Sequence, residues 1–166
     1  MFLQFFAWGT WYVTLGTYLS TMGFDGTDIG DAYSAAAWAA LISPLFVGLI
    51  ADRFFSAQRV LGLLHLIAAA CLFWVSTLEE PTTFFFGLLL LMLCYMPTIA
   101  LTNAVCFHQM SDSGSEFPKV RAFGTIGWIA AGWLVGTLEI ESTALPMKIA
   151  AFASILTLSL IHISEP

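Results

Sequence analysis

Charged residues are scarce in this chain. Asp, Glu, Lys and Arg make up only 10% of its 166 residues, whereas soluble domains average about 25%. So few charges cannot cover a water-facing surface, which argues against a soluble enzyme, and the 59% hydrophobic content excludes intrinsic disorder. Five Lys and Arg against eleven Asp and Glu provide no basic stripe for nucleic acid. The class that remains is a polytopic membrane protein.

Cysteine and histidine are also few, and neither is clustered. Cys71, Cys94 and Cys106 all lie inside apolar runs, which indicates packing residues and neither a disulfide framework nor a zinc site. His65 and His108 have no carboxylate or second histidine one helical turn away. The sequence therefore predicts no metal and no cofactor. It also offers no nucleophilic or paired-carboxylate constellation for an intramembrane enzyme.

Long apolar runs dominate what is present. Each is near the length of about 20 residues that a helix needs to span a bilayer, and polar turns separate them. Continuous runs of this length exclude barrel strands. The sequence therefore predicts an all-α fold with six transmembrane helices. The segments are Phe2–Met22, Gly30–Ile50, Val60–Thr77, Phe84–Gln109, Pro118–Thr137 and Met147–Ile163.

The basic residues indicate how these segments are oriented. Arg53 and Arg59 fall between the second and third segments, and Lys119 and Arg121 fall at the break where the fifth segment begins. Both connections lie on one side of the membrane, so the positive-inside rule makes that side, and the N-terminus, cytoplasmic. The opposite loops are acidic. They contain Asp25, Asp28, Asp31, Glu79, Glu80, Glu139 and Glu141.

The last eight residues differ from the rest of the chain. His162, Ser164, Glu165 and Pro166 interrupt the sixth apolar segment, where a spanning helix would continue with apolar residues. We therefore expect residues 1–158 to form one six-helix bundle and residues 159–166 to be an atypical tail that is not native sequence. We also expect the chain to be truncated.

Four stretches carry a family resemblance. Gly48-Leu-Ile-Ala-Asp52-Arg53, at the end of the second segment, resembles the signature between helices two and three of the major facilitator superfamily, with Phe55 in place of its second glycine. The first segment reads FLQFFAWGTWYVTLGTYL. The fourth contains YMPTIALTNAVCFHQM, and the fifth opens with FPKVRAFGTIGW. Together they resemble the nucleoside–proton symporters of that superfamily, over the first six of their twelve helices. The resemblance implies that Asp52 and Arg53 act in gating.

The fifth segment carries the strongest candidates for substrate contact. On a helix that starts near Pro118, Arg121, Thr125 and Trp128 share one face and offer a guanidinium, a hydroxyl and a flat aromatic ring. These groups suit the carbonyls, hydroxyls and planar base of a nucleoside. By resemblance, the family places such residues in its substrate cavity. The alternative is that Arg121 reaches the cytoplasmic headgroups and Trp128 only packs.

The fourth segment adds a second polar face. Tyr95, Thr98 and Thr102 stand on one side of the predicted helix, Asn103 is adjacent, and Pro97 predicts a bend because it removes a backbone donor. We identify Thr98, Thr102 and Asn103 as candidate substrate-binding residues. The alternative is that they bond only to neighbouring helices.

The first segment adds one further candidate, Trp8, which shares a face with Gln4 and Trp11. An aromatic belt at the membrane interface is the alternative explanation for its indole. Gly132 and Gly136 form a G-x-x-x-G pair, which predicts close helix packing within the bundle.

No Asp or Glu lies deep in any segment. Proton coupling normally uses an intramembrane carboxylate or histidine, so we expect the coupling carboxylate to lie in a missing C-terminal six-helix half. The resemblance implies a secondary transporter of the cytoplasmic (inner) membrane, which takes up nucleosides with protons by alternating access and is not an enzyme. Its partners would be a nucleoside, protons and the lipid bilayer. A non-transporting assembly or scaffold subunit is the alternative.

Overall fold

The computed structural model describes residues 1–53 and 57–163, and the side chains of residues 1–43 and 57–159. Within these residues the chain is helical and contains no strand. This confirms the predicted all-α class. The helices are α1 (Phe2–Tyr12), α2 (Leu15–Thr21), α3 (Gly26–Arg53), α4 (Ala57–Val75), α5 (Pro81–His108), α6 (Ser113–Leu138) and α7 (Leu145–Ile163).

The predicted segments and the observed helices agree except in the first segment. Each of the other five corresponds to one helix, from α3 to α7. The prediction of one continuous helix over Phe2–Met22 is wrong, because α1 ends at Tyr12 and α2 begins at Leu15. At the C-terminal end of α2, Gly23 has a φ of 87° and the Phe24 amide donates to the Leu19 carbonyl at 3.1 Å, so a Schellman motif closes the helix.

Acidic residues cap the N-termini of three helices and fix where each begins. The Asp25 carboxylate accepts two amide hydrogen bonds at the start of α3, and the Glu80 carboxylate does the same before α5. Asp112 caps α6, and its amide in turn donates to Glu116 at 3.3 Å. Because of this cap, α6 begins five residues earlier than predicted. Pro118 therefore lies inside the helix and not in its first turn.

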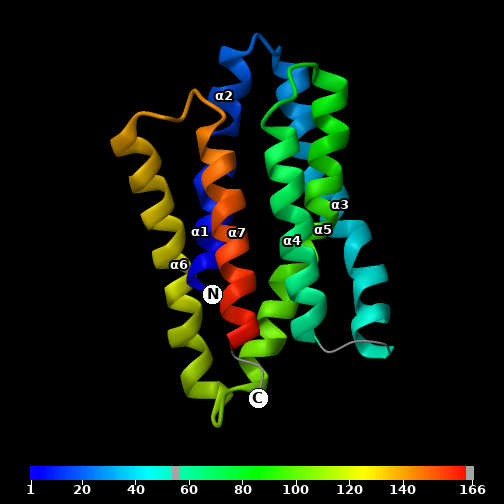
Figure 1. Cartoon of the computed structure of the whole chain (residues 1–166), viewed down its shortest axis with the longest axis vertical. Helices are drawn as coiled ribbons and strands as arrows, with labels where there is room; N and C mark the ends of the chain where they lie inside the picture. The colour runs from blue at the N-terminus through cyan, green and yellow to red at the C-terminus, as the bar shows by residue number, and fades with distance from the viewer. Residues whose placement is uncertain (54–56, 164–166) are drawn as a thin grey trace.

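The helices run alternately in opposite directions through the bundle (Figure 1). The connections from α2 to α3, from α4 to α5 and from α6 to α7 lie at one end, which we call the acidic end because it contains Asp25, Glu79 and Glu139. The connection from α5 to α6 lies at the opposite end, beside Lys119. The structure thus has the alternation on which the predicted orientation depends.

Small residues in the core allow the helices to approach closely. Helix α3 packs against α5, α4 packs against α5 and α7, and α1 packs against α6 and α7. Alanines such as Ala35, Ala68 and Ala151 are fully or almost fully buried beside larger residues such as Leu91 and Phe84. Large apolar side chains also face outward, as lipid contact requires. Of the described helices, α4 and α5 are long and apolar enough to cross a membrane by themselves.

Glycines bring α1 and α6 together. A Cβ atom on Gly127 would lie 2.3 Å from the Phe2 carbonyl oxygen, and one on Gly124 would lie 2.7 Å from the Phe5 ring. The predicted packing role of Gly132 and Gly136 is wrong. Both are exposed, and a Cβ atom on either would meet nothing within 4 Å among the described residues. The close contact uses the side of α6 that carries Gly124 and Gly127.

Candidate binding site

A buried network of polar side chains occupies the middle of the bundle, with Gln4 of α1 at its centre. The Gln4 Nε2 donates to Thr98 Oγ1 at 2.7 Å, and the Gln4 Oε1 accepts from Thr102 Oγ1 at 3.3 Å. The His65 Nε2 lies 2.8 Å from the same Gln4 oxygen, and the Tyr95 hydroxyl donates to the Gln4 carbonyl. One glutamine therefore joins the first span to α4 and α5.

This arrangement determines the proton position on His65. Because the Gln4 amide nitrogen donates to Thr98, its oxygen faces the imidazole, so Nε2 must be the nitrogen that carries hydrogen. The Nδ1 atom then presents a lone pair. It is buried and has no partner among the described residues. Both His65 and Gln4 are buried, with exposed fractions of 0% and 2%.

Thr98 and Thr102, both candidate binding residues, lie inside this network. Thr98 is fully buried, accepts from Gln4 and donates to the Tyr95 carbonyl at 2.5 Å, so its hydroxyl is already committed. Thr102 is 8% exposed and donates to Gln4. Asn103 is half-buried beside them, and its Oδ1 is a buried acceptor with no partner in the described part of the chain. The bend predicted at Pro97 stays a prediction, although α5 is helical on both sides of it.

Aromatic rings continue from this network along the contact between α1 and α6. The Trp8 ring packs edge-on against Trp128 at 5.4 Å and lies 5.5 Å from Tyr12 and 6.2 Å from Tyr95. Phe5 lies one turn before Trp8, with a ring separation of 6.4 Å. We call these five rings the aromatic cluster. The Trp8 indole N–H within it is buried and unpartnered among the described residues.

Arg121 lies at the end of the aromatic cluster that is farther from the acidic end. Its guanidinium carbon is 4.5 Å from the centre of the Phe5 ring, which is cation–π geometry. Arg121 and Thr125 are exposed, and Trp128 is half-buried. The face predicted on α6 therefore places a cation, a hydroxyl and an indole in sequence along one side of the helix, beside Phe5 and Trp8 of α1. The other two predicted residues, Asp52 and Arg53, fall at the end of α3, and their side chains lie outside the described residues.

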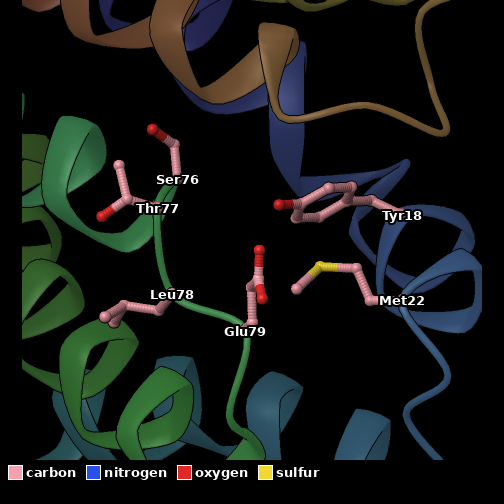
Figure 2. Close-up of a pocket in the computed structure, with 6 residues that line it drawn as sticks. All are labelled: Tyr18, Met22, Ser76, Thr77, Leu78 and Glu79. Atoms are coloured by element: carbon pink, nitrogen blue, oxygen red, sulfur yellow. The ribbon is translucent and has the colours of Figure 1, made fainter.

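A separate cavity of about 390 Å³ opens at the acidic end, between α2 and the turn after α4 (Figure 2). Tyr18 and Met22 line one side, and the Glu79 carboxylate projects between them and Thr77. The Thr77 hydroxyl donates to the Trp74 carbonyl of its own helix at 2.7 Å.

Comparison with known proteins establishes the family. A sequence model described as nucleoside H+ symporter matches residues 1–164. The chain belongs to this family. It is 41% identical over 160 residues to the xanthosine permease of Escherichia coli and 38% identical over 171 residues to the nucleoside permease NupG of the same organism. These alignments cover 93% and 98% of the chain, but only 38% and 41% of the two relatives.

The fold of the family agrees with the structure described here. A crystal structure of the nucleoside transporter NupG superimposes with a TM-score of 0.93 at 36% identity, covering 99% of this chain and 42% of that one. The chain thus spans about two-fifths of the length of the relatives that it matches. Symporters are membrane transport proteins and not enzymes, which agrees with the class predicted from composition.

The sequence did not identify two residues at the centre of the buried polar network, Gln4 and His65. Gln4 was placed on the same face as Trp8, but its partners lie 61 to 98 residues away. A polar residue within an apolar run was the available signal, because such a residue must find a partner in a membrane. The identity of that partner could come only from the packing of three helices.

Proposed function

We propose that this chain supplies the N-terminal six-span bundle of a major facilitator superfamily transporter that takes up nucleosides with protons. The observation that carries the proposal is membership of the nucleoside H+ symporter family, with a TM-score of 0.93 to a nucleoside transporter over 99% of the chain. A second bundle of six spans would complete the protein, since the relatives are more than twice as long. The two bundles would expose the site to each side of the membrane in turn.

The aromatic cluster and Arg121 support binding of a nucleoside. The Trp8 and Trp128 rings offer apolar surface for a planar base, and the Arg121 guanidinium offers donors to base carbonyls or ribose oxygens. Thr125 would add a hydroxyl on the same face of α6. Trp8 Nε1 and Asn103 Oδ1 are a buried donor and a buried acceptor without described partners, and a ligand or water would satisfy them. Thr98 and Thr102 would act mainly by holding Gln4 in place.

The distribution of charge supports an orientation in the cytoplasmic membrane with the N-terminus inside. Lys119 and Arg121 lie near the connection between α5 and α6, and the opposite end is acidic. The positive-inside rule assigns the basic end to the cytoplasm. Asp52 and Arg53 would then lie at the cytoplasmic rim, where a gating contact with the second bundle would form. A carboxylate that binds the coupling proton would lie in that second bundle, because no Asp or Glu lies deep in the six spans.

Uptake measurements on the full-length protein test this proposal. In cells that lack other nucleoside permeases, we expect accumulation of labelled nucleoside that a protonophore abolishes. Arg121→Ala removes a charged hydrogen-bond donor worth about 1.5–3 kcal/mol, so uptake should fall at least tenfold, and Arg121→Lys should recover only part of it.

Lys119→Ala is the matched control, because it removes a positive charge two residues earlier, on a different face of α6. Uptake by this variant should remain close to that of the unmutated protein. Equal losses in both variants would show that general surface charge, and not the Arg121 guanidinium, supports uptake. Full uptake by Arg121→Ala would refute its assignment to the substrate site.

A further inference from the structure

A side chain from another span occupies the break between α1 and α2. In a continuous helix the Gly16 amide would donate to the Tyr12 carbonyl, four residues earlier. Instead, the Gly16 amide donates to the Tyr33 hydroxyl at 3.0 Å, and that hydroxyl donates to the Tyr12 carbonyl at 3.2 Å. The phenol of α3 is thus inserted between the two groups that would otherwise pair.

This insertion accounts for the break in physical terms. Sharp helix bends arise at proline, at a π-bulge, or where a side chain enters the backbone ladder, and residues 1–22 contain no proline. Thr14, at the break, has φ −96° and ψ 0°, outside the helical region, whereas Val13 remains helical. We attribute the break, and the change of direction that would accompany it, to this contact with α3.

We expect the inserted and the straight arrangements to be close in free energy. Withdrawal of the phenol would let Gly16 and Tyr12 bond to each other directly, so no backbone group would be left unpaired. The loss would be one hydrogen bond, that of the Tyr33 hydroxyl. A typical net hydrogen bond corresponds to a population ratio of about fivefold. An element whose two states differ by so little can be switched by a ligand.

Ring contacts connect this element to the aromatic cluster. The Tyr33 ring packs edge-on against Tyr12 at 5.4 Å, Tyr12 lies 5.5 Å from Trp8, and Trp8 lies 5.4 Å from Trp128. We propose that Tyr33 is a positioning residue for transport: its inserted hydroxyl sets the bend of the first span, and its ring couples that bend to occupancy of the aromatic cluster. The coupling to substrate depends on the function proposed above, whereas the insertion itself does not.

Pulsed electron paramagnetic resonance on the full-length protein tests the insertion. Spin labels at Ser20 and Thr82, both exposed at the acidic end, report the position of α2 relative to α5. Cys71, Cys94 and Cys106, together with every cysteine of the second bundle, are first replaced by alanine. Tyr33→Phe keeps the ring and removes the hydroxyl, so the ratio of bent to straight populations should fall about fivefold. Tyr18→Phe, which removes a phenol hydroxyl from α2, should leave the distances as they were. A Tyr33→Phe distribution that superimposes on the unmutated one would overturn the proposal.

Nucleoside uptake tests the coupling. Because Trp8 and Trp128 are unchanged in Tyr33→Phe, KM should stay within about twofold while the maximal rate falls about fivefold. An unchanged maximal rate alongside altered distances would overturn the coupling. Failure of the unmutated protein to take up any nucleoside would instead overturn the proposed function, and the distance measurement would still decide whether the hydroxyl sets the bend.

Discussion

Replacement of Gly127 by alanine tests the closest helix contact in the bundle. A Cβ atom at this position would lie 2.3 Å from the Phe2 carbonyl oxygen and 3.1 Å from the Phe2 carbonyl carbon, whereas ordinary contact begins at 3.4 Å. The neighbour is backbone, so no rotamer change can relieve the overlap. Helices α1 and α6 would have to separate by about 1 Å. Overpacking of this kind costs about 1–3 kcal/mol, which for a chain of this length lowers Tm by about 3–9 °C.

Thermal unfolding of the purified protein in detergent, followed by tryptophan fluorescence, measures this change. Gly132→Ala is the matched control, because it adds the same methyl group to the same helix where nothing lies within 4 Å. Its Tm should be equal to or above that of the unmutated protein. If Gly127→Ala were as stable as Gly132→Ala, the two helices would not approach as closely as described.

Three further predictions follow from local geometry. Glu139 has a φ of 53°, so Glu139→Gly should raise the unfolding free energy by about 1 kcal/mol in denaturant titration. Gln4→Leu breaks three hydrogen bonds to side chains at roughly 0.6 kcal/mol each, so thermal unfolding should show a Tm lower by about 4–7 °C. Hydrogen bonds from Thr83 and Thr82 lower the pKa of Glu80 from 4.5 to about 2. Above pH 4.5 the unmutated protein should therefore have a higher free energy of unfolding than Glu80→Gln, and this difference should vanish as pH falls towards 2.

Much of the fold could be predicted because its determinants are local. Runs of apolar residues locate α3 to α7 and the helical first segment, and their alternation fixes which connections share an end. The N-terminus of α6 was misplaced although a local signal existed: Asp112 and Glu116 form a reciprocal cap that precedes Pro118 by several residues. Proline is favoured in a first turn, but a side-chain cap is the stronger determinant of where a helix begins here.

The features that could not be predicted depend on contacts between distant residues. The break after Tyr12 is caused by Tyr33, which lies on another helix. Likewise, the glycines that matter for packing were not distinguishable by spacing, because Gly132 and Gly136 fit the motif while Gly127 makes the contact. In the candidate site, α6 carries Arg121, Thr125 and Trp128 as expected, and their roles remain a proposal.

The tight approach of α1 and α6 limits how the bundle can change shape. At Gly127 only hydrogen atoms separate the backbone of one helix from that of the other, so there is no clearance for either helix to rotate or slide relative to its partner. The two must travel as a single rigid body. Any rearrangement of the first segment is therefore confined to the part beyond Tyr12, where α2 can move relative to α1.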